Sequence, residues 1–225
     1  MGVIQLDGLF ECTKCPRLVA YRQGIKPARG RSREQYHNRP VPGFGDPAAR
    51  VCLVGLAPGA HGANRTGRPF TGDGAGDFMY PLLYEAGFAS QPEVEHLDDG
   101  LQLHDLYIAN AVKCVPPENK PTGTEFDNCR PYLAQELAAL TNLQVIIALG
   151  RGAFDSCLKH FRATGLVDRP ANYPFAHDAR FELAPGFWLV ACYHTSRYNV
   201  QTGRMTAPMF RRFLSDVHAL LDENG

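Results

Sequence analysis

The stretch Gly55–Asp73, which reads GLAPGAHGANRTGRPFTGD, holds the residue types best suited to bind a substrate. Its many Gly, Pro, Asn and Thr residues predict an irregular loop, and so long a loop inside a compact domain is typical of function. It follows the apolar run Val51–Val54, and open α/β sheets bind ligands where their strands end. Arg65 and Arg68 lie beside Phe70, which favours a phosphate-bearing substrate with a flat ring over a metal or a peptide.

Four of the seven cysteines form two pairs, Cys12-x-x-Cys15 and Cys114-x14-Cys129. Thiolates at the first spacing can close on one metal centre from a tight turn, and the second pair completes a set of four. Zinc and a [4Fe–4S] cluster both accept four thiolates, so the spacing leaves both open. A thioredoxin-type redox motif would follow a strand, whereas this one precedes the first predicted strand. Buried thiols are expected at the remaining three positions, Cys52, Cys157 and Cys192.

Elements that could position these residues alternate along the chain. Short, nearly continuous apolar runs predict four strands that are buried on both faces, at Val51–Leu56, Leu106–Asn110, Val145–Leu149 and Trp188–Tyr193. Apolar spacing predicts helices at Phe78–Glu85, Thr124–Leu140, Gly152–Phe161 and Pro208–Leu221. A capping box, Thr122-x-x-Glu125, marks the start of the second helix. The alternation predicts a three-layer α/β/α fold with a central, mostly parallel four-stranded sheet.

We expect residues 1–225 to form a single domain, because no repeat, linker or low-complexity tract divides the chain. Parallel strands end at one edge of a sheet. The loops after the first, second and fourth predicted strands therefore converge on one cleft, and these are the Gly55 loop, residues 110–120 and residues 194–204. The chemistry of the chain is expected there.

The formal net charge is zero, so no field of the whole molecule indicates a nucleic-acid partner. The segment Lys14–Arg50 nevertheless holds nine Lys and Arg residues against only Glu34 and Asp46. Such a segment is either a solvated basic loop or a contact for phosphate groups. The chain has no apolar stretch long enough to span a membrane and no signal peptide at its start, so a cytoplasmic protein without membrane contact is expected.

Four motifs in order resemble the iron–sulfur uracil-DNA glycosylases, and among them family 5. The match begins with Cys12-x-x-Cys15 and ends with Tyr193-His194-Thr195-Ser196. Between them come Gly55-Leu56-Ala57-Pro58-Gly59 with Arg68-Pro69-Phe70-Thr71-Gly72-Asp73, and Asn110-Ala111-Val112-Lys113-Cys114-Val115-Pro116-Pro117 with Cys129. The resemblance covers nearly the whole chain.

The resemblance implies a monofunctional glycosylase of base-excision repair, nucleoid-associated and expected to be a monomer. Such an enzyme hydrolyses the N-glycosidic bond of uracil in DNA, with hypoxanthine and xanthine as further substrates of this family, and first flips the nucleotide out of the stack. It also implies a [4Fe–4S] cluster on the four cysteines, with zinc as the less favoured occupant. No lyase step follows, because no residue is indicated as the amine nucleophile of a Schiff base.

Ala57 stands where most of this superfamily has an Asp, Asn or Glu that activates water, and alanine there matches the family 5 pattern. Alanine cannot accept a proton or orient a water molecule. His194 matches the histidine of the last motif and is predicted to stabilise the leaving base, the largest gain open to such an enzyme. Asp73 is predicted either to position the water or to cap the helix that follows it. Asn110 is predicted to read the edge of the base.

The same resemblance indicates residues that line the base pocket and residues that contact DNA. Phe70 is predicted to stack on the flipped base. Further substrate contacts are expected at Gly55, Ala57, His61 and Asn64, with Asn119 a secondary candidate. Contacts to DNA are expected from four arginines: Arg65, Arg68, Arg197 as the residue that fills the gap in the stack, and Arg204.

Two other function classes remain open on the sequence. A cluster- or zinc-stabilised DNA-binding domain without catalysis would use the basic segment and Phe70, and the alanine at position 57 supports it. A hydrolase or transferase of small nucleotides would need a GxGxxG or Walker loop, and the Gly55 loop matches neither.

Overall fold

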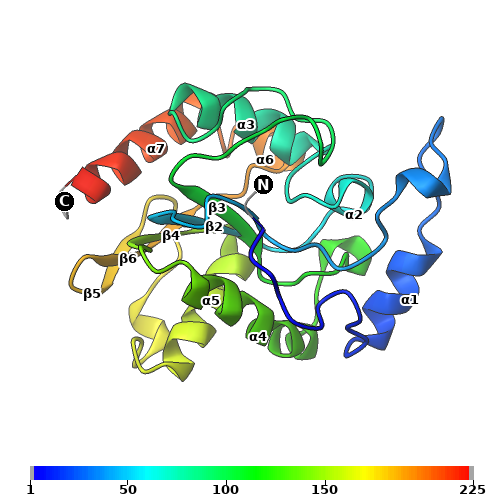
Figure 1. Cartoon of the computed structure of the whole chain (residues 1–225). Helices are drawn as coiled ribbons and strands as arrows, with labels where there is room; N and C mark the ends of the chain where they lie inside the picture. Colours follow the sequence, from blue (N-terminus) through cyan, green and yellow to red (C-terminus); the bar gives the residue numbers. More distant parts are fainter. Residues whose placement is uncertain (1–2, 223–225) are drawn as a thin grey trace.

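In the part of the chain that the structure describes, six strands form one sheet in the order β1-β3-β2-β4-β6-β5. The structure is a computed structural model that describes residues 3–222 (Figure 1). The strands are β1 (Phe44–Gly45), β2 (Val51–Gly55), β3 (Leu106–Asn110), β4 (Val145–Leu149), β5 (Arg180–Ala184) and β6 (Phe187–Cys192). The helices are α1 (Pro16–Gly24), α2 (Ala63–Thr66), α3 (Gly74–Glu85), α4 (Gly123–Ala139), α5 (Arg151–Ala163), α6 (Arg197–Gln201) and α7 (Ala207–Asp222). Three short 3-10 turns are η1 (Arg33–Gln35), η2 (Pro117–Asn119) and η3 (Pro170–Asn172).

The four predicted strands are confirmed as β2, β3, β4 and β6, and they pair in parallel. The expectation of four strands in total is wrong, because an antiparallel strand is added at each edge of the sheet. β1 is only two residues long, which is too short to leave a pattern in the sequence. β5 is only partly buried, so it lacks the continuous apolar run that marks the central strands. The sheet is mixed at its edges and parallel at its centre.

Both faces of the sheet are covered, which explains the continuous apolar runs. Val51 and Leu53 of β2 belong to one core with residues of α3 and α7. Cys52 and Val54 of the same strand belong to a second core with residues of α4 and α5. Figure 1 shows α3 and α7 on one side of the sheet and α4 and α5 on the other. The three-layer α/β/α prediction is therefore confirmed.

The long helices follow from local signals in the sequence. The capping box of α4 is present, with Glu125 N donating to Thr122 Oγ1 (3.3 Å) and Thr122 N donating to Glu125 Oε2 (2.7 Å). The core face of α7 consists of the apolar residues spaced three and four apart: Phe210, Phe213, Leu214, Val217, Leu220 and Leu221. The prediction of an irregular Gly55–Asp73 loop is wrong at one place, where the single turn α2 forms.

The order of the parallel strands sets the position of the site. From β2 the chain crosses to β3 on one side, whereas β4 lies on the other side of β2 and leads on to β6. Open α/β sheets bind ligands at the carboxyl ends of strands where the order reverses in this way. Gly55 and Asn110 end two of these strands side by side in register. Within residues 3–222 no helix has the length and apolar character needed to cross a membrane.

Candidate active site

A pocket of about 400 Å³ lies at the carboxyl edge of the sheet. Its walls come from the loop after β2, the start of α3, the end of β3, η2 and the segment between β6 and α6. The residues that line it are Leu56, Ala57, Gly59, Ala63, Phe70, Asp73, Gly74, Ala75, Asn110, Asn119, His194, Ser196 and Arg197. Three loops that the sequence predicted to converge therefore do so. Of the predicted catalytic residues, the pocket brings His194, Asp73 and Asn110 together.

Asn110 closes the floor of this pocket. Its side chain is 2% exposed, and its Oδ1 has no hydrogen-bond partner among residues 3–222. A buried amide oxygen without a partner costs free energy, and such a group in a native structure needs an explanation. Gly55 lies against it, since a Cβ there would come within 2.5 Å of both Asn110 Oδ1 and Phe70 Cζ. The floor therefore offers an acceptor to a ligand and has no room for a side chain at position 55.

Phe70 is held in a costly backbone conformation. Its φ is +52°, in the left-handed region that non-glycine residues rarely adopt. Gly76 allows the turn, because a Cβ at that position would overlap the carbonyl oxygen of Phe70. The ring is 7% exposed, and its centroid lies 6.0 Å from that of the His194 ring at an interplanar angle of 41°. Strain at a ring that lines a pocket is typical of a functional position.

His194 follows β6 and lines the pocket together with Phe70. Burial lowers the pKa of His194 from 6.5 to about 4, so its imidazole is neutral at pH 7. Its Nδ1 is buried and has no hydrogen-bond partner in the described part of the chain. The backbone is fixed by Asn199, whose Nδ2 donates to the His194 carbonyl oxygen at 2.8 Å. The imidazole is thus positioned by its main chain and keeps a ring nitrogen for a ligand.

Asp73 has one confirmed role and one that stays a prediction. Its Oδ1 accepts hydrogen bonds from Ala75 N (3.0 Å) and Gly76 N (3.1 Å), so it is the N-cap of α3. The residue also lines the pocket, and its Oδ2 lies against Gly62, where a Cβ would overlap it. Capping fixes the carboxylate at the pocket wall. The cap and the proposed action on water are therefore compatible, because they use different oxygens.

Ala57 and Asn119 face the same space from two loops. Ala57 lines the pocket and contributes no polar group to it. Asn119 ends η2, where Glu118 and Asn119 have φ values of +54° and +56°. Two consecutive left-handed residues turn this loop sharply and place the Asn119 amide at the rim. The secondary candidate of the sequence analysis is therefore a pocket residue.

Two predicted substrate contacts lie elsewhere. Asn64 is fully buried and does not line the pocket, and its Nδ2 donates to Asn38 Oδ1 at 2.9 Å. His61 has an exposed side chain outside the pocket, and its Nδ1 is hydrogen-bonded to Tyr36 Oη at 2.8 Å. Both residues stabilise the loop after β2, which the sequence could not distinguish from substrate contact.

The four arginines that were predicted to bind DNA differ in their surroundings. Arg68 is fully buried, where its guanidinium pairs with Asp99 (2.8 and 2.5 Å) and its Nε donates to Thr71 Oγ1. The expectation that Arg68 contacts DNA is therefore wrong. Arg197 lines the pocket at the start of α6. Arg65 is half-buried, and Arg204 lies over the Tyr193 ring at 4.6 Å.

The two cysteine pairs, which are far apart in the sequence, meet at a second, small cavity. It is lined by Cys12, Cys15, Cys114 and Cys129 together with apolar side chains such as Leu9, Leu18 and Val112. Hydrogen-bond donors surround the sulfurs: Lys113 N lies 3.1 Å from Cys129 Sγ, Arg22 Nη1 3.0 Å from Cys114 Sγ and Asn128 Nδ2 3.5 Å from Cys15 Sγ. Within residues 3–222 no group of three or more His, Cys, Asp and Glu side chains is arranged around a single metal ion.

Burial is confirmed for the other three cysteines, Cys52, Cys157 and Cys192.

A buried ion pair connects the two sites, and the sequence analysis missed it. Lys113 and Glu136 are both fully buried and pair with each other, while Glu136 Oε1 accepts from Gly43 N at 2.7 Å. Lys113 lies between Asn110 and Cys114, so the pair holds this segment against α4, which also carries Cys129. In the sequence, the one indication that Glu136 faces the core is its position beside the apolar residues Leu133 and Leu137. Removing one partner of such a pair leaves the other charge buried and unpaired, which destabilises the fold.

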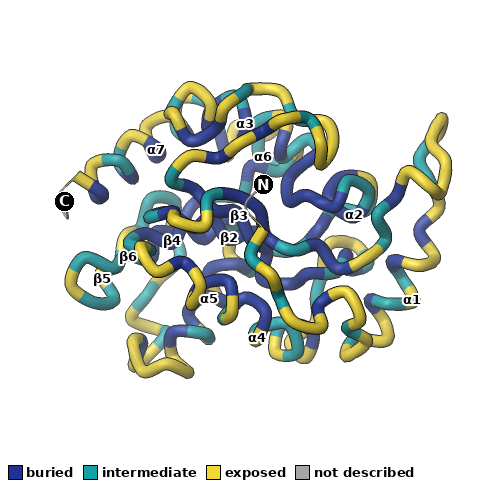
Figure 2. The backbone as a smooth tube through the Cα atoms, in the orientation of Figure 1, coloured by how far each residue is buried: buried dark blue, intermediate teal, exposed yellow. Residues whose placement is uncertain are grey.

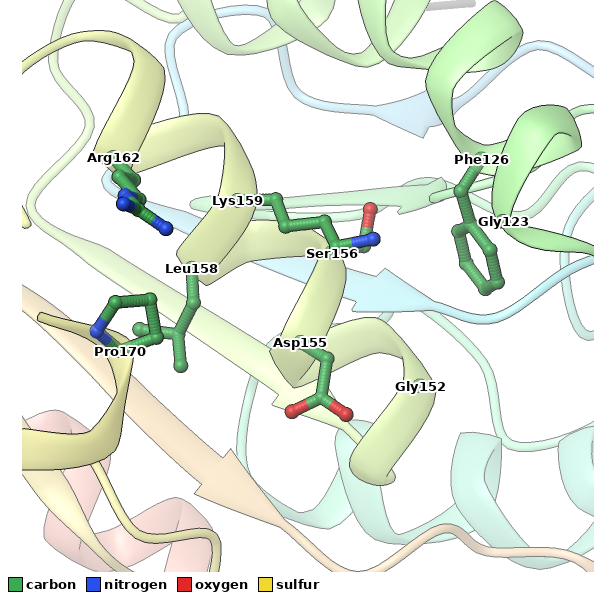
Figure 3. Close-up of a pocket in the computed structure, with 9 residues that line it drawn as sticks. All are labelled: Gly123, Phe126, Gly152, Asp155, Ser156, Leu158, Lys159, Arg162 and Pro170. Carbon is green, nitrogen blue, oxygen red and sulfur yellow. The ribbon is translucent and has the colours of Figure 1, made fainter.

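Figure 3 shows a further hollow, of about 460 Å³, between α4, α5 and η3. It is lined by Phe126, Ser156, Lys159, Arg162 and Pro170 among others, and it contains none of the motif residues. Gly152 forms part of its wall and touches Leu56 of the first pocket, since a Cβ there would lie 2.7 Å from Leu56 Cδ1. The hollow is a neighbour of the candidate site and is separated from it by this contact.

Comparison with known proteins gives a consistent picture. A family model described as "Uracil DNA glycosylase superfamily" matches residues 42–218. The chain is 50% identical over 216 residues to a type-5 uracil-DNA glycosylase of Thermus thermophilus, covering 94% of each chain. It is 42% identical to a type-5 uracil-DNA glycosylase of Pyrobaculum aerophilum, over 96% of this chain and 93% of the other. A type-4 uracil-DNA glycosylase of Archaeoglobus fulgidus is 37% identical over only 50% of this chain.

Proposed function

The chain belongs to the uracil DNA glycosylase superfamily, and from this premise we propose that it is a type-5 uracil-DNA glycosylase of base-excision repair. It hydrolyses the bond between uracil and deoxyribose in DNA and is monofunctional. One observation carries the proposal: the pocket at the carboxyl edge of the sheet gathers His194, Asn110, Phe70 and Asp73 around Ala57. A match that runs the length of the type-5 relatives supports the assignment to that type.

Recognition of the base is assigned to Asn110 and Phe70. A uracil in the pocket presents an N3–H donor next to an O4 acceptor, and an amide side chain offers the complementary acceptor and donor. The unpartnered Asn110 Oδ1 supplies the acceptor for N3–H. Phe70 stacks on the ring, which favours any flat base and gives affinity more than selectivity. Gly55 allows the base to approach this floor closely.

Stabilisation of the leaving base is assigned to His194. When the bond from C1′ to the base nitrogen breaks, the electron pair goes to the base, and negative charge develops on its oxygen. A neutral imidazole N–H, held by the main chain in a buried site, stabilises that charge without reorganising first. Its lowered pKa supports a hydrogen bond from neutral histidine in place of a charged imidazolium. This term is the main catalytic contribution in our proposal.

Water handling is assigned to Asp73, because Ala57 has no group that could do it. Water adds its oxygen to C1′, and the proton that it loses neutralises the released base anion. An Asp73 carboxylate fixed by its cap at the pocket wall can orient that water or stabilise positive charge on the sugar. The Asn119 amide at the rim is a second polar group within the same pocket.

Contacts to DNA are assigned to three arginines. Arg197 begins α6 at the mouth of the pocket and is proposed to fill the space that the flipped nucleotide leaves in the stack. Arg65 and Arg204 are proposed to contact phosphates near it. Schiff-base chemistry is not part of the proposal: Lys113, the lysine nearest in sequence to Asn110, is buried and ion-paired with Glu136.

The four cysteines are proposed to hold a [4Fe–4S] cluster. The four cysteines surround one apolar cavity, and N–H donors are directed at three of their sulfurs. Hydrogen bonds to cysteine sulfurs in an apolar setting suit a sulfur-rich group. The cluster would supply structural cross-linking between α1, the segment after β3 and α4. We further propose that the chain is a single glycosylase domain that acts as a monomer in the cytoplasm, associated with the nucleoid.

The assay that tests the proposal uses matched duplexes with one uracil, hypoxanthine, xanthine or thymine. Purified protein should convert the uracil strand to a form that breaks in alkali and stays intact without it, while the thymine strand is unaffected. Conversion of hypoxanthine or xanthine would extend the substrate class, as the open stacking on Phe70 predicts. Breakage without alkali would contradict a monofunctional enzyme.

The neutral His194 leads to a prediction about pH. In the unfolded chain His194 takes up a proton near pH 6.5, whereas in the folded protein burial lowers its pKa to about 4. Between these values the unfolded state binds more protons, so this residue lowers stability as the pH falls from about 6.5 to 4. The excision rate, measured in single turnover from pH 8 down to 5, should show no loss centred near pH 6.5. A decline with its midpoint there would mean that His194 titrates at its ordinary pKa, and a rise there would mean that the active form is protonated.

A further inference from the structure

A basic arm projects from the molecule between α1 and the rest of the fold. We define the arm as residues 26–35, and it lies at the end of the molecule beyond α1 and α2 (Figure 1). Lys26, Arg29, Arg31 and Arg33 are all exposed, and Glu34 is the one acidic residue of the arm. Figure 2 shows this projection as a mainly exposed segment. A surplus of positive charge on an exposed projection is typical of a surface that binds a polyanion.

The base of the arm is fixed to the loops that form the active site. Ile25 and Tyr36, at its two ends, form a buried cluster with Val115, and Ala60 packs against this cluster. Ala60 belongs to the loop after β2, and Val115 directly follows Cys114. Tyr36 Oη also accepts from Ala28 N at 3.0 Å and is hydrogen-bonded to His61 Nδ1 at 2.8 Å. The arm is therefore held in a set place relative to the pocket.

The arm has internal structure of its own. Gly30 has a φ of +78°, which permits the tight turn closed by Arg31 N donating to Ala28 O at 3.0 Å. Ser32 and Gln35 form a capping box on η1. Arg33 Nη2 donates to Gln23 O at 2.6 Å, and this hydrogen bond connects the C-terminal half of the arm to α1. A surface already ordered in this way loses less conformational entropy when it binds.

The charges of the arm are not neutralised by the protein. In the described part of the chain, Lys26, Arg29 and Arg33 form no ion pair, whereas Arg50, Arg180 and Arg211 each pair with a carboxylate. Arg31 differs from the other cations of the arm, because it lines a hollow that also contains Asp77 and Glu95. Three cations thus remain for an external anion.

We propose that the arm is a DNA-backbone contact, with Lys26, Arg29 and Arg33 bound to phosphates of the duplex that flanks the flipped nucleotide. This inference rests on the proposed function for the identity of the anion, because DNA is the substrate assigned to the adjacent pocket. Contacts to phosphate fix position and carry no sequence information. The arm contributes affinity and register on the duplex, and the chemistry remains with the pocket.

Phosphate contacts release counterions, so they have a measurable signature. Each contact to duplex DNA contributes about 0.9 to the slope of log K against log salt concentration. The variant Lys26→Ala/Arg29→Ala/Arg33→Ala should therefore bind a uracil-free duplex with a salt slope smaller by about 2 to 3. All three side chains are exposed, so thermal unfolding should be close to that of the parent protein.

The control is Lys159→Ala/Arg162→Ala/Arg212→Ala, which removes the same charge from exposed residues of α5 and α7. Fluorescence anisotropy with a labelled duplex between about 50 and 200 mM KCl gives the slopes. The proposal predicts a reduced slope for the arm variant and a slope within about 0.5 of the parent for the control. Equal slopes for the arm variant and the parent, or an equal reduction in the control, would overturn it.

A second readout separates this inference from the proposed function. In single-turnover assays on a uracil duplex, the arm variant should need more protein to reach its half-maximal rate, and the excess should shrink at low salt. If no form of the protein removes uracil, the proposed function fails, but the salt slopes on uracil-free duplex still decide whether the arm binds DNA.

Discussion

Replacing His194 with alanine should lower the single-turnover rate of uracil excision by about 100- to 1,000-fold, the cost of losing one well-placed donor to a developing anion. The side chain lines the pocket, is neutral at pH 7 and keeps a buried ring nitrogen without a partner in residues 3–222. Alanine removes the donor and also a buried group without a hydrogen-bond partner, so the fold should survive. The measurement is excision at saturating protein, with duplex binding and thermal unfolding recorded on the same preparation.

His104→Ala is the matched control, because His104 is exposed and lies outside the pocket. It should keep the parent rate. A His194→Ala protein that is folded, binds the duplex and excises uracil at the parent rate would remove the leaving-group argument. Loss of binding in parallel with loss of rate would indicate that His194 acts on affinity instead of the transition state.

Replacing Cys12 with alanine should mainly destabilise the protein, by more than about 4 kcal/mol, the range associated with loss of a metal centre. Cys12 and Cys15 lie at the start of α1, and their partners Cys114 and Cys129 lie in the segment after β3 and in α4. Without the proposed cluster, three elements that are far apart in sequence would lose their common anchor. Denaturant unfolding measures the effect, and the visible absorbance near 400 nm, of the order expected for an iron–sulfur centre, should disappear.

Cys157→Ala serves as the control, because Cys157 is a fully buried residue of α5 and lies outside the four-cysteine cavity. It should keep the absorbance and cost only about 1 kcal/mol. A colourless parent protein that contains one zinc ion would contradict the cluster assignment. A Cys12→Ala protein as stable as the parent would contradict the structural role.

Much of the fold could be predicted because the parallel strands leave strong patterns. A strand buried on both faces is a continuous apolar run, and Val51–Gly55 and Val145–Leu149 are such runs. The edge strands β1 and β5 could not be predicted. β1 pairs with β3, which is distant in sequence, and its two residues are too few to form an apolar run. β5 forms a partly exposed hairpin with β6, so it also lacks a continuous apolar run.

For the candidate site, residues at strand ends were predicted better than residues within the long loop. Asn110 ends β3 and His194 follows β6, and the topology of a parallel sheet places such residues at one edge. Arg68 and Asn64 are polar residues of a loop, and nothing local shows that Arg68 meets Asp99, 31 residues away. Polarity alone does not separate pocket residues from supporting residues. In the structure, Arg68 and Asn64 support the pocket from inside the fold.

Alanine at position 57 cannot accept a proton or orient a water molecule. We therefore propose that most of the rate comes from stabilising the leaving group, through His194 and the floor at Asn110. The buried Lys113–Glu136 pair holds that floor in the segment that also bears Cys114. The proposed base-reading residue and one proposed cluster ligand therefore lie in the same short segment.

The most direct test of the account is the amount of free uracil released from a duplex that contains one uracil opposite guanine. The purified protein, with its visible spectrum recorded, is mixed in excess with the duplex, and released base is quantified against time by mass spectrometry. We predict one uracil per duplex, with the abasic strand left intact. No uracil from a folded, coloured protein that binds the duplex would contradict the account and identify the chain as a DNA-binding module that lacks catalysis.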